Sequence, residues 1–143
     1  MKIRFKRLHP AAVAPKQGTL GAAGFDLTAT SRKWDDDLNV WEYGTGIAVE
    51  IPHGHVGLLF PRSSVYKTGN IMSNCCGVID SDYRGEIMAK FYVNNWHIGQ
   101  LHYAPGDRIA QLVIVPIPEV EYVEVDKLTE TERGTGGYGS TGK

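Results

Sequence analysis

The stretch "DRIAQLVIVPI" (residues 107–117) gives the strongest indication of the fold. It is rich in apolar and β-branched residues, and turn-forming residues bound it, namely Pro105 and Gly106 before it and Pro116 and Pro118 at its end. A short apolar run between such residues is typical of a buried β-strand. We therefore expect a strand here.

Further β-rich segments recur along the chain, each bounded by glycine or proline: "GIAVEIP" (46–52), "HVGLLFP" (55–61), "EIMAKFYVNN" (86–95) and "EVEYVEVD" (119–126). Only "RSSVYKTG" (62–69) suggests a helix, a short one that Ser63 or Ser64 is placed to cap. Many short strands at this spacing predict an all-β protein, a sandwich or jelly roll. Loops between the strands should then carry any catalytic residues.

Composition limits the function classes. A chain of 143 residues with 42% hydrophobic and 22% charged residues is typical of one globular domain. The formal net charge of −1 provides no general attraction for nucleic acid or for a membrane, so we expect no direct binding to either. The longest apolar stretch is too short to span a bilayer, and the N-terminus lacks the apolar core of a signal peptide. Cys75 and Cys76 are adjacent, which is poor geometry for a mutual disulfide, and we expect a reduced, cytoplasmic protein.

The C-terminal stretch "ERGTGGYGSTGK" (132–143) spells G-x-G-x-x-G and also G-x-x-x-x-G-K. Both patterns bind phosphates at the N-terminus of the helix that follows them, and here no helix follows. Two interpretations remain open from the residues alone. The segment is either a disordered glycine-rich tail or a tail that folds over a nucleotide.

Two stretches in the first half of the chain carry polar groups that a plain β-sandwich does not need. "AAGFDLTA" (22–29) places Asp26 between apolar neighbours, so its carboxylate should enter or border the core; a structural turn cap is the alternative. "FPRSSVYKTG" (60–69) places Arg62 beside hydroxyl residues at the start of the expected helix. A guanidinium, hydroxyls and backbone donors together suit a phosphate, and a surface arginine beside a capped helix is the alternative.

Two later stretches complete the set. In "SNCCGVIDSDYRGEI" (73–87), Asp80 follows the apolar pair Val78 and Ile79, which should desolvate the carboxylate and adjust it to act as a base. The alternative is a turn that is simply rich in Asp and Gly. "APGDRIAQLVI" (104–114) carries Gln111 and the neighbours Asp107 and Arg108, for which we favour a structural ion pair.

The order of these stretches is more specific than any one of them. AGFDL, PRSS, GVIDSDYRGE, PGDRIAQL and RGTGGYGSTG closely resemble the five ordered motifs of the trimeric dUTP diphosphatases (dUTPases), from about Ala22 to Gly142. The departures are small. Cys75 and Cys76 stand where the family more often has Ser-Pro, and Ser64 replaces a frequent glycine. The segment "RKWDDDLNVWEYG" (32–44) is similar to a variable loop.

The resemblance implies a homotrimer of jelly-roll domains with shared active sites at the subunit interfaces. Residues 1–132 would form the jelly-roll domain, and residues 133–143 a mobile arm that closes over the substrate. The implied reaction is Mg²⁺-dependent hydrolysis of dUTP to dUMP and pyrophosphate by water attack on the α-phosphate. It keeps uracil out of DNA and supplies dUMP for dTMP synthesis.

The resemblance also implies roles for single residues. Asp80 matches the general base, and Asp26 the aspartate that helps to hold the water shell of the metal. Arg108 is expected to be structural. The expected triphosphate contacts are Arg62, Ser63, Gln111, Arg133 and Ser140, and Ser64 and Gly139 are further expected substrate contacts. The expected contacts to the nucleoside are Asn74, Gly77, Val78, Ile79, Tyr83, Met88 and Tyr138, where Tyr83 packs on the deoxyribose and Tyr138 stacks on uracil.

Two rival functions belong to the same resemblance. One is the related dCTP deaminase, which "DSDYRGE" and the intact "RGTGGYGSTG" fit less well. The other is a non-catalytic regulator that binds a nucleotide and a protein partner, for which the segment 32–44, with Trp34 and Trp41, is the expected contact region.

Overall fold

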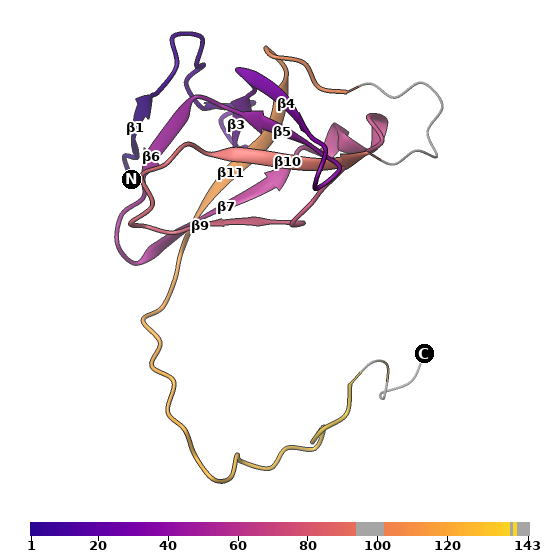
Figure 1. Cartoon of the computed structure of the whole chain (residues 1–143). Coiled ribbons are helices and arrows are strands. Elements are labelled where there is room, and N and C mark those ends of the chain that lie inside the picture. The colour runs from indigo at the N-terminus through magenta and orange to yellow at the C-terminus, as the bar shows by residue number, and fades with distance from the viewer. Residues whose placement is uncertain (94–101, 138, 140–143) are drawn as a thin grey trace.

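The computed structural model describes residues 1–93, 102–137 and 139, and it is an all-β sandwich of the jelly-roll type (Figure 1). One layer has the strand order β4-β5-β10-β8 and the other the order β2-β3-β11-β7-β9, while β1 pairs with β6. The bounds of the first layer are β4 Ser31–Asp35, β5 Val40–Gly44, β10 Met88–Val93 and β8 Asn70–Met72. Those of the second are β2 Lys16–Gln17, β3 Phe25–Thr28, β11 Arg108–Pro116, β7 His55–Pro61 and β9 Gly77–Ile79; the outer pair is β1 Arg4–Arg7 and β6 Ile47–Glu50.

Strand β11 organises the second layer and confirms the prediction for residues 107–117. It pairs antiparallel with β7 from Ala110 opposite Pro61 to Pro116 opposite His55, and on its other side with β3. The predicted strands at 46–52 and 55–61 are confirmed by β6 and β7, and β10 confirms the described part of the one at 86–95. Because β11 is central, it fixes the relative positions of β3 and β7, which carry two of the sequence motifs.

The core lies between the two layers. Three aromatic rings meet edge to face there, with centroid distances of 5.8 Å for Tyr43 and Phe91, 6.0 Å for Tyr43 and Tyr103, and 5.5 Å for Phe91 and Tyr103. Such pairs contribute about 0.5–1.5 kcal/mol each beyond the burial of their area. Leu27, Leu59 and Ile109 pack in the same cluster. The loops at the ends of the sandwich are therefore attached to a rigid body.

The expectation of a variable loop at 32–44 is wrong, because most of this segment forms the paired strands β4 and β5. Trp34 lies opposite Trp41 in register, and their rings meet edge to face at 5.1 Å. Asn39 takes the left-handed conformation that the turn requires, with φ 56°. Both indoles are half-buried, and the Arg32 guanidinium lies 4.4 Å from the Trp41 ring centre. The tryptophans are thus occupied with each other and with Arg32.

The expected short helix is present as a 3₁₀ helix, η1, over Ser63–Lys67. The expected serine cap is wrong. Arg62 is the N-cap residue, with extended backbone and no hydrogen bond from its side chain to the helix end. Within the described ranges, no helix is long and apolar enough to cross a membrane.

The expected strand at 119–126 is also wrong for the single chain. The Ile117 N–H donates to the Gly54 carbonyl at 2.8 Å, and beyond this point the chain leaves the sandwich (Figure 1). None of the described strands lies beside the alternating apolar residues there; Tyr122, for example, is 96% exposed. A β pattern becomes a strand only when another strand supplies its hydrogen bonds.

Candidate active site

The segment from Gly77 to Ile87 forms the first part of the candidate site: it runs along β9, turns at residues 80–83 and leads to β10 in the other layer, and it is called the hairpin below although its two arms do not pair as strands. Strand β9 pairs with β7, and the chain turns back where the Tyr83 N–H donates to the Asp80 carbonyl at 3.2 Å. One guanidinium nitrogen of Arg84 donates to the carbonyls of Ser81 (2.7 Å) and Tyr83 (2.9 Å). The hairpin is therefore closed by its own polar groups, which hold Asp80 and Tyr83 in a fixed relation.

Tyr83 lies along this hairpin and limits the space beside it. Its hydroxyl donates to the Glu86 carbonyl at 2.9 Å. A Cβ atom at Gly85 would lie only 2.3 Å from the hydroxyl oxygen, so the position needs glycine. A pocket of about 210 Å³ opens next to the ring, lined by Val78, Ile79, Asp80, Tyr83, Glu86, Ile87 and Met88.

Asp80 stands at the end of β9 and is exposed. The expectation that Val78 and Ile79 desolvate it is wrong for the single chain, where Val78 is 64% exposed. The reason is that β9 is the outermost strand of its sheet, and none of the described strands covers its outer side. Asn74 is likewise exposed, in the turn that precedes β9. In that turn Cys75 has φ 57°, and both cysteines are free.

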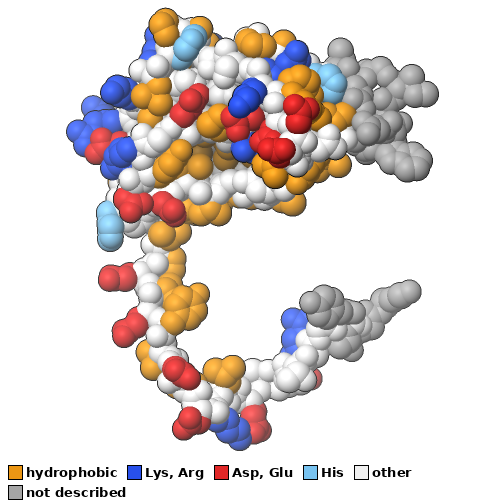
Figure 2. Space-filling model, viewed as in Figure 1, with side chains coloured by type: hydrophobic (Ala, Val, Ile, Leu, Met, Phe, Trp, Pro, Cys, Tyr) orange, Lys and Arg blue, Asp and Glu red, His pale blue; other side chains and the backbone are white. Residues whose placement is uncertain are grey.

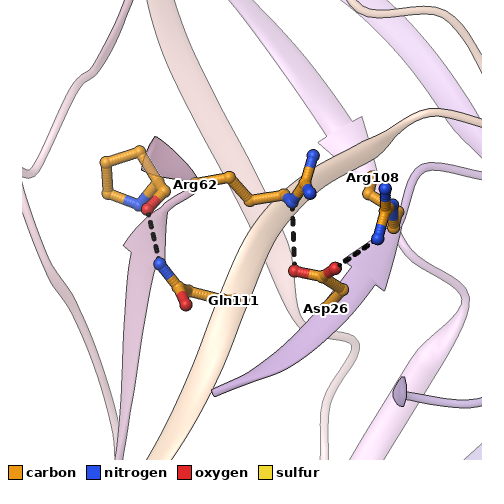
Figure 3. Close-up of polar contacts among 5 residues, drawn as sticks. Asp26, Arg62, Arg108 and Gln111 are labelled. Carbon is orange, nitrogen blue, oxygen red and sulfur yellow. Dashed lines mark hydrogen bonds and ion pairs between the residues drawn. The ribbon is translucent and has the colours of Figure 1, made fainter. Parts of the chain in front are cut away.

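The second part of the site is a carboxylate held between two arginines. The Arg62 Nε–H donates to Oδ1 of Asp26 at 3.0 Å, and the Arg108 Nη1–H donates to Oδ2 at 2.8 Å (Figure 3). The Asp26 side chain is 14% exposed, so it borders the core as expected. The expected ion pair between Arg108 and Asp107 is wrong. Asp107 instead accepts the backbone N–H of Ala104 at 2.8 Å, and its carboxylate closes that turn.

Gln111 completes this cluster from β11, where it lies directly opposite Asp26 on β3. Its side-chain amide donates to the Pro61 carbonyl at 3.1 Å, which ties the residue before Arg62 to β11 (Figure 3). A Cβ atom at Gly24 would lie 2.8 Å from the Gln111 amide oxygen, so the glycine leaves room for that side chain. Ser63 and Ser64 follow directly, at the start of η1.

One chain therefore carries two separate polar groups of residues. The hairpin pocket contains Asp80 and Tyr83, while the second cluster contains Asp26 on β3, Arg108 and Gln111 on β11, and Arg62 at the N-cap of η1. Among the described residues, no hydrogen bond or ion pair between side chains joins them. Of the predicted arm residues, Arg133 and Gly139 lie in the exposed C-terminal segment, and Tyr138 and Ser140 lie outside the described residues.

Two features were missed from the sequence, one within the site and one beside it. Glu86 links the hairpin to the sandwich. Its carboxylate accepts a hydrogen bond from the Gly46 N–H at 2.7 Å, and its carbonyl accepts one from the Tyr83 hydroxyl. Tyr103 and His102 line a cleft with Arg62 and Arg108. No local pattern indicated either feature, since both depend on contacts between residues distant in sequence.

Comparison with known proteins identifies the family. The dUTPase family model matches residues 11–142. The deoxyuridine 5'-triphosphate nucleotidohydrolase of Nautilia profundicola is 42% identical over the whole of both chains, and that of Wolinella succinogenes is 42% identical over the whole of this chain and 95% of its own. A mutant dUTPase of Staphylococcus bacteriophage 80alpha, solved with dUpNHpp, superposes with a TM-score of 0.80 over 99% of each chain at 25% identity. The chain belongs to the dUTPase family, whose enzymes hydrolyse dUTP to dUMP and pyrophosphate.

Proposed function

We propose that this chain hydrolyses dUTP at sites that combine the hairpin pocket of one subunit with the Asp26–Arg62–Gln111 cluster of another. The observation that supports this division is that no hydrogen bond or ion pair between side chains of the described residues joins the two groups in one chain. Asp80 supplies a carboxylate that forms no described ion pair, and Arg84 of the same turn is bound to the carbonyls of Ser81 and Tyr83, while Arg62 and Arg108 are paired with Asp26 and have no free carboxylate beside them in the described contacts. Hydrolysis of a triphosphate needs both, because a water must lose a proton while negative charge grows on the departing phosphates.

In this proposal the hairpin binds the nucleoside. Backbone groups of Gly77 to Ile79 and the Asn74 amide read the polar edge of uracil, and Met88 contacts the nucleotide at the pocket wall. The Tyr83 ring packs on the deoxyribose, where its hydrogen bond to Glu86 prevents it from moving aside for a 2′-hydroxyl. Asp80 accepts a proton from the water that attacks the α-phosphorus. A base in position contributes about 10²–10⁴ in rate.

The cluster binds the triphosphate. Arg62, Ser63 and Ser64 supply a guanidinium and hydroxyls at one loop, and Gln111 supplies its amide from β11. Because the Asp26 carboxylate and the Gln111 contact to Pro61 fix this loop, its donors are held in place before the substrate arrives. Donors that are already oriented stabilise developing charge without the cost of rearranging.

The described residues offer a magnesium ion few direct ligands. The described residues contain no group of three or more His, Cys, Asp or Glu side chains that could hold a metal ion. Both Asp26 oxygens already accept hydrogen bonds from arginines, so this residue would reach the ion only through water. Mg²⁺ commonly keeps several waters and binds substrate phosphates, where it supplies positive charge. We therefore propose that Mg²⁺ enters with the triphosphate.

We further propose that the active assembly is a homotrimer and that residues 133–143 form an arm distinct from the domain at 1–132. The segment after Ile117 supports this, since it extends away from the sandwich with its apolar residues exposed (Figure 1). Acidic side chains also line this segment, and basic residues of β1, Arg4, Lys6 and Arg7, are exposed on the sandwich (Figure 2). Such a segment can reach a second subunit, where Arg133, Tyr138, Gly139 and Ser140 would close over the nucleotide.

Pyrophosphate release from dUTP, dTTP, dCTP and UTP, measured side by side, tests the proposed function. We expect turnover of dUTP and rejection of dCTP by on the order of 10⁴-fold, because the wrong base leaves buried polar groups unpaired. Release of ammonia from dCTP would assign the chain to the deaminases instead. Binding of dUTP without any turnover would leave it as a nucleotide-dependent regulator.

A further inference from the structure

A cleft next to the Asp26 cluster contains polar groups that the proposed reaction does not use. It has a volume of about 470 Å³ and is lined by Arg62, Thr68, His102, Tyr103, Gly106, Asp107 and Arg108. Its residues differ entirely from those of the hairpin pocket. The cleft and the hairpin pocket have no lining residue in common, but the cleft and the proposed triphosphate site share Arg62.

Two buried polar atoms in this cleft have no hydrogen-bond partner in the described structure, the Tyr103 hydroxyl and Nδ1 of His102. Tyr103 is only 6% exposed. The Thr68 oxygen lies close enough to affect the pKa of Tyr103, but the contact lacks the geometry of a hydrogen bond, and the Thr68 proton goes to the Val65 carbonyl at 2.7 Å. A buried hydroxyl without a partner costs about 1–3 kcal/mol, so it marks a position where a ligand group or a water would be stabilised.

The charge of the cleft favours an anion with several oxygens. Arg62 and Arg108 each use one described hydrogen bond on Asp26, through Nε and Nη1 respectively, and their remaining N–H groups are available to the cleft. Burial is the largest effect on Tyr103 and raises its pKa despite the opposing Thr68 hydroxyl and Arg62 guanidinium, and the Asp107 charge adds to the rise, so the phenol stays a proton donor. Asp107 is the one carboxylate in the lining, and it accepts the Ala104 N–H. Guanidinium and phenol donors together match phosphate oxygens.

We propose that this cleft binds inorganic pyrophosphate after the pyrophosphate has separated from the α-phosphate. The proposal rests on the proposed function, because the reaction supplies the pyrophosphate and Arg62 would pass it from the triphosphate site to the cleft. The Tyr103 hydroxyl and the His102 ring nitrogen, in its protonated tautomer, donate to the anion. They are binding residues for the product and do not take part in hydrolysis.

The test is calorimetric titration of the full-length protein with inorganic pyrophosphate, together with product inhibition of dUTP hydrolysis. Tyr103→Phe removes only the hydroxyl, and His102→Phe keeps a ring next to Trp41, which lies 5.8 Å away between centroids. Each should weaken pyrophosphate binding about tenfold, the value of one hydrogen bond to a charged group. The KM for dUTP and kcat should stay within about twofold of wild type. Tyr92→Phe, which removes a hydroxyl from an exposed strand position, is the matched control and should change nothing.

Stability separates this result from a folding defect. Because the Tyr103 hydroxyl has no partner, its removal should leave Tm unchanged or raise it. Unchanged affinity for pyrophosphate in both variants would overturn the proposal. A KM for dUTP that rises as much as the Kd for pyrophosphate would also overturn it, because the cleft would then belong to the triphosphate site. Equal binding of sulfate would overturn it as well, because the cleft would then be an unspecific cationic surface. These titrations need no turnover, so a failure to hydrolyse dUTP would refute the proposed function independently.

Discussion

Arg62 and Asp26 are 36 positions apart in sequence and are joined by a hydrogen bond of 3.0 Å between Nε and Oδ1. The guanidinium comes from the N-cap of η1 and the carboxylate from β3, so the contact links two of the sequence motifs across β11. Since the second carboxylate oxygen accepts from Arg108, a single acidic residue orients two cations. This makes Asp26 a positioning residue for Arg62, in addition to any contact it makes with the water around a metal ion.

Asp26→Asn tests this relationship. The amide keeps one acceptor oxygen and loses the charge, so one arginine should lose its orientation. We expect a loss of about 1–3 kcal/mol in unfolding free energy, because the side chains of Asp26 and Arg62 are largely buried. The KM for dUTP should rise, and the rise should persist at saturating Mg²⁺. Asp37→Asn, on an exposed loop, is the control. Full recovery of KM by added Mg²⁺ would show that Asp26 acts through the ion alone.

Asp80→Asn tests the general base. The amide preserves the shape of the side chain but cannot accept the proton, so turnover should fall about 10²–10⁴-fold while dUTP still binds. The measurements are kcat and the Kd of a non-hydrolysable dUTP analogue. Asp82→Asn removes an exposed carboxylate from the same hairpin and should leave turnover nearly unchanged. Turnover of the Asp80 variant within tenfold of wild type would exclude this assignment.

Tyr83 should determine the choice of sugar through its ring. Tyr83→Ala removes the steric block, so the ratio of kcat/KM for UTP to that for dUTP should rise. Tyr83→Phe loses the hydrogen bond to Glu86 but keeps the ring, and its ratio should stay closer to wild type. The same competition assay with UTP and dUTP measures both. If the Ala variant folds and its ratio does not change, sugar selection lies elsewhere in the site.

The strands of the sandwich were predictable because their signals are local. The apolar run of residues 107–117 and the turn residues around it specify β11 without knowledge of its neighbours. The strand expected at 119–126 failed for the opposite reason. Its alternation is a β pattern, yet the described part of the single chain provides no strand to pair with it. A sequence pattern states what a segment can form, and a partner decides whether it forms.

In the site, too, single residues could be predicted from the sequence but their contacts could not. Asp26 and Arg62 could be selected because an isolated polar group in an apolar stretch needs an explanation. Their contact could not be derived from the sequence. Nor could the finding that Arg108 pairs with Asp26 and not with Asp107, since both contacts depend on the register between β3 and β11. The cleft with Tyr103 had no sequence signal at all. Tyrosine in a core is ordinary, and only the structure shows that its hydroxyl lacks a partner.

Mixing two inactive variants tests whether subunits share sites. One variant is Asp80→Asn, and the other ends at Glu132 and lacks the arm. In a mixed trimer, some sites would combine an intact Asp80 from one chain with an intact arm from another, and part of the activity should return. Mass spectrometry of the intact assembly establishes that mixed trimers form. If they form and stay inactive, each chain must supply both parts to its own site.

The truncated variant alone tests the arm. Ending the chain at Glu132 removes Arg133 and the glycine-rich segment but no strand, so Tm should stay close to that of the full chain. Catalysis should suffer more, because Arg133 and the backbone N–H groups act where charge builds on the departing pyrophosphate. Loss of one such donor costs about 10²–10³ in turnover, and loss of several should cost at least as much. Binding of a dUTP analogue should weaken less if Arg62 still contacts the phosphates. Normal turnover after truncation would mean that residues 133–143 are a tail without a catalytic role.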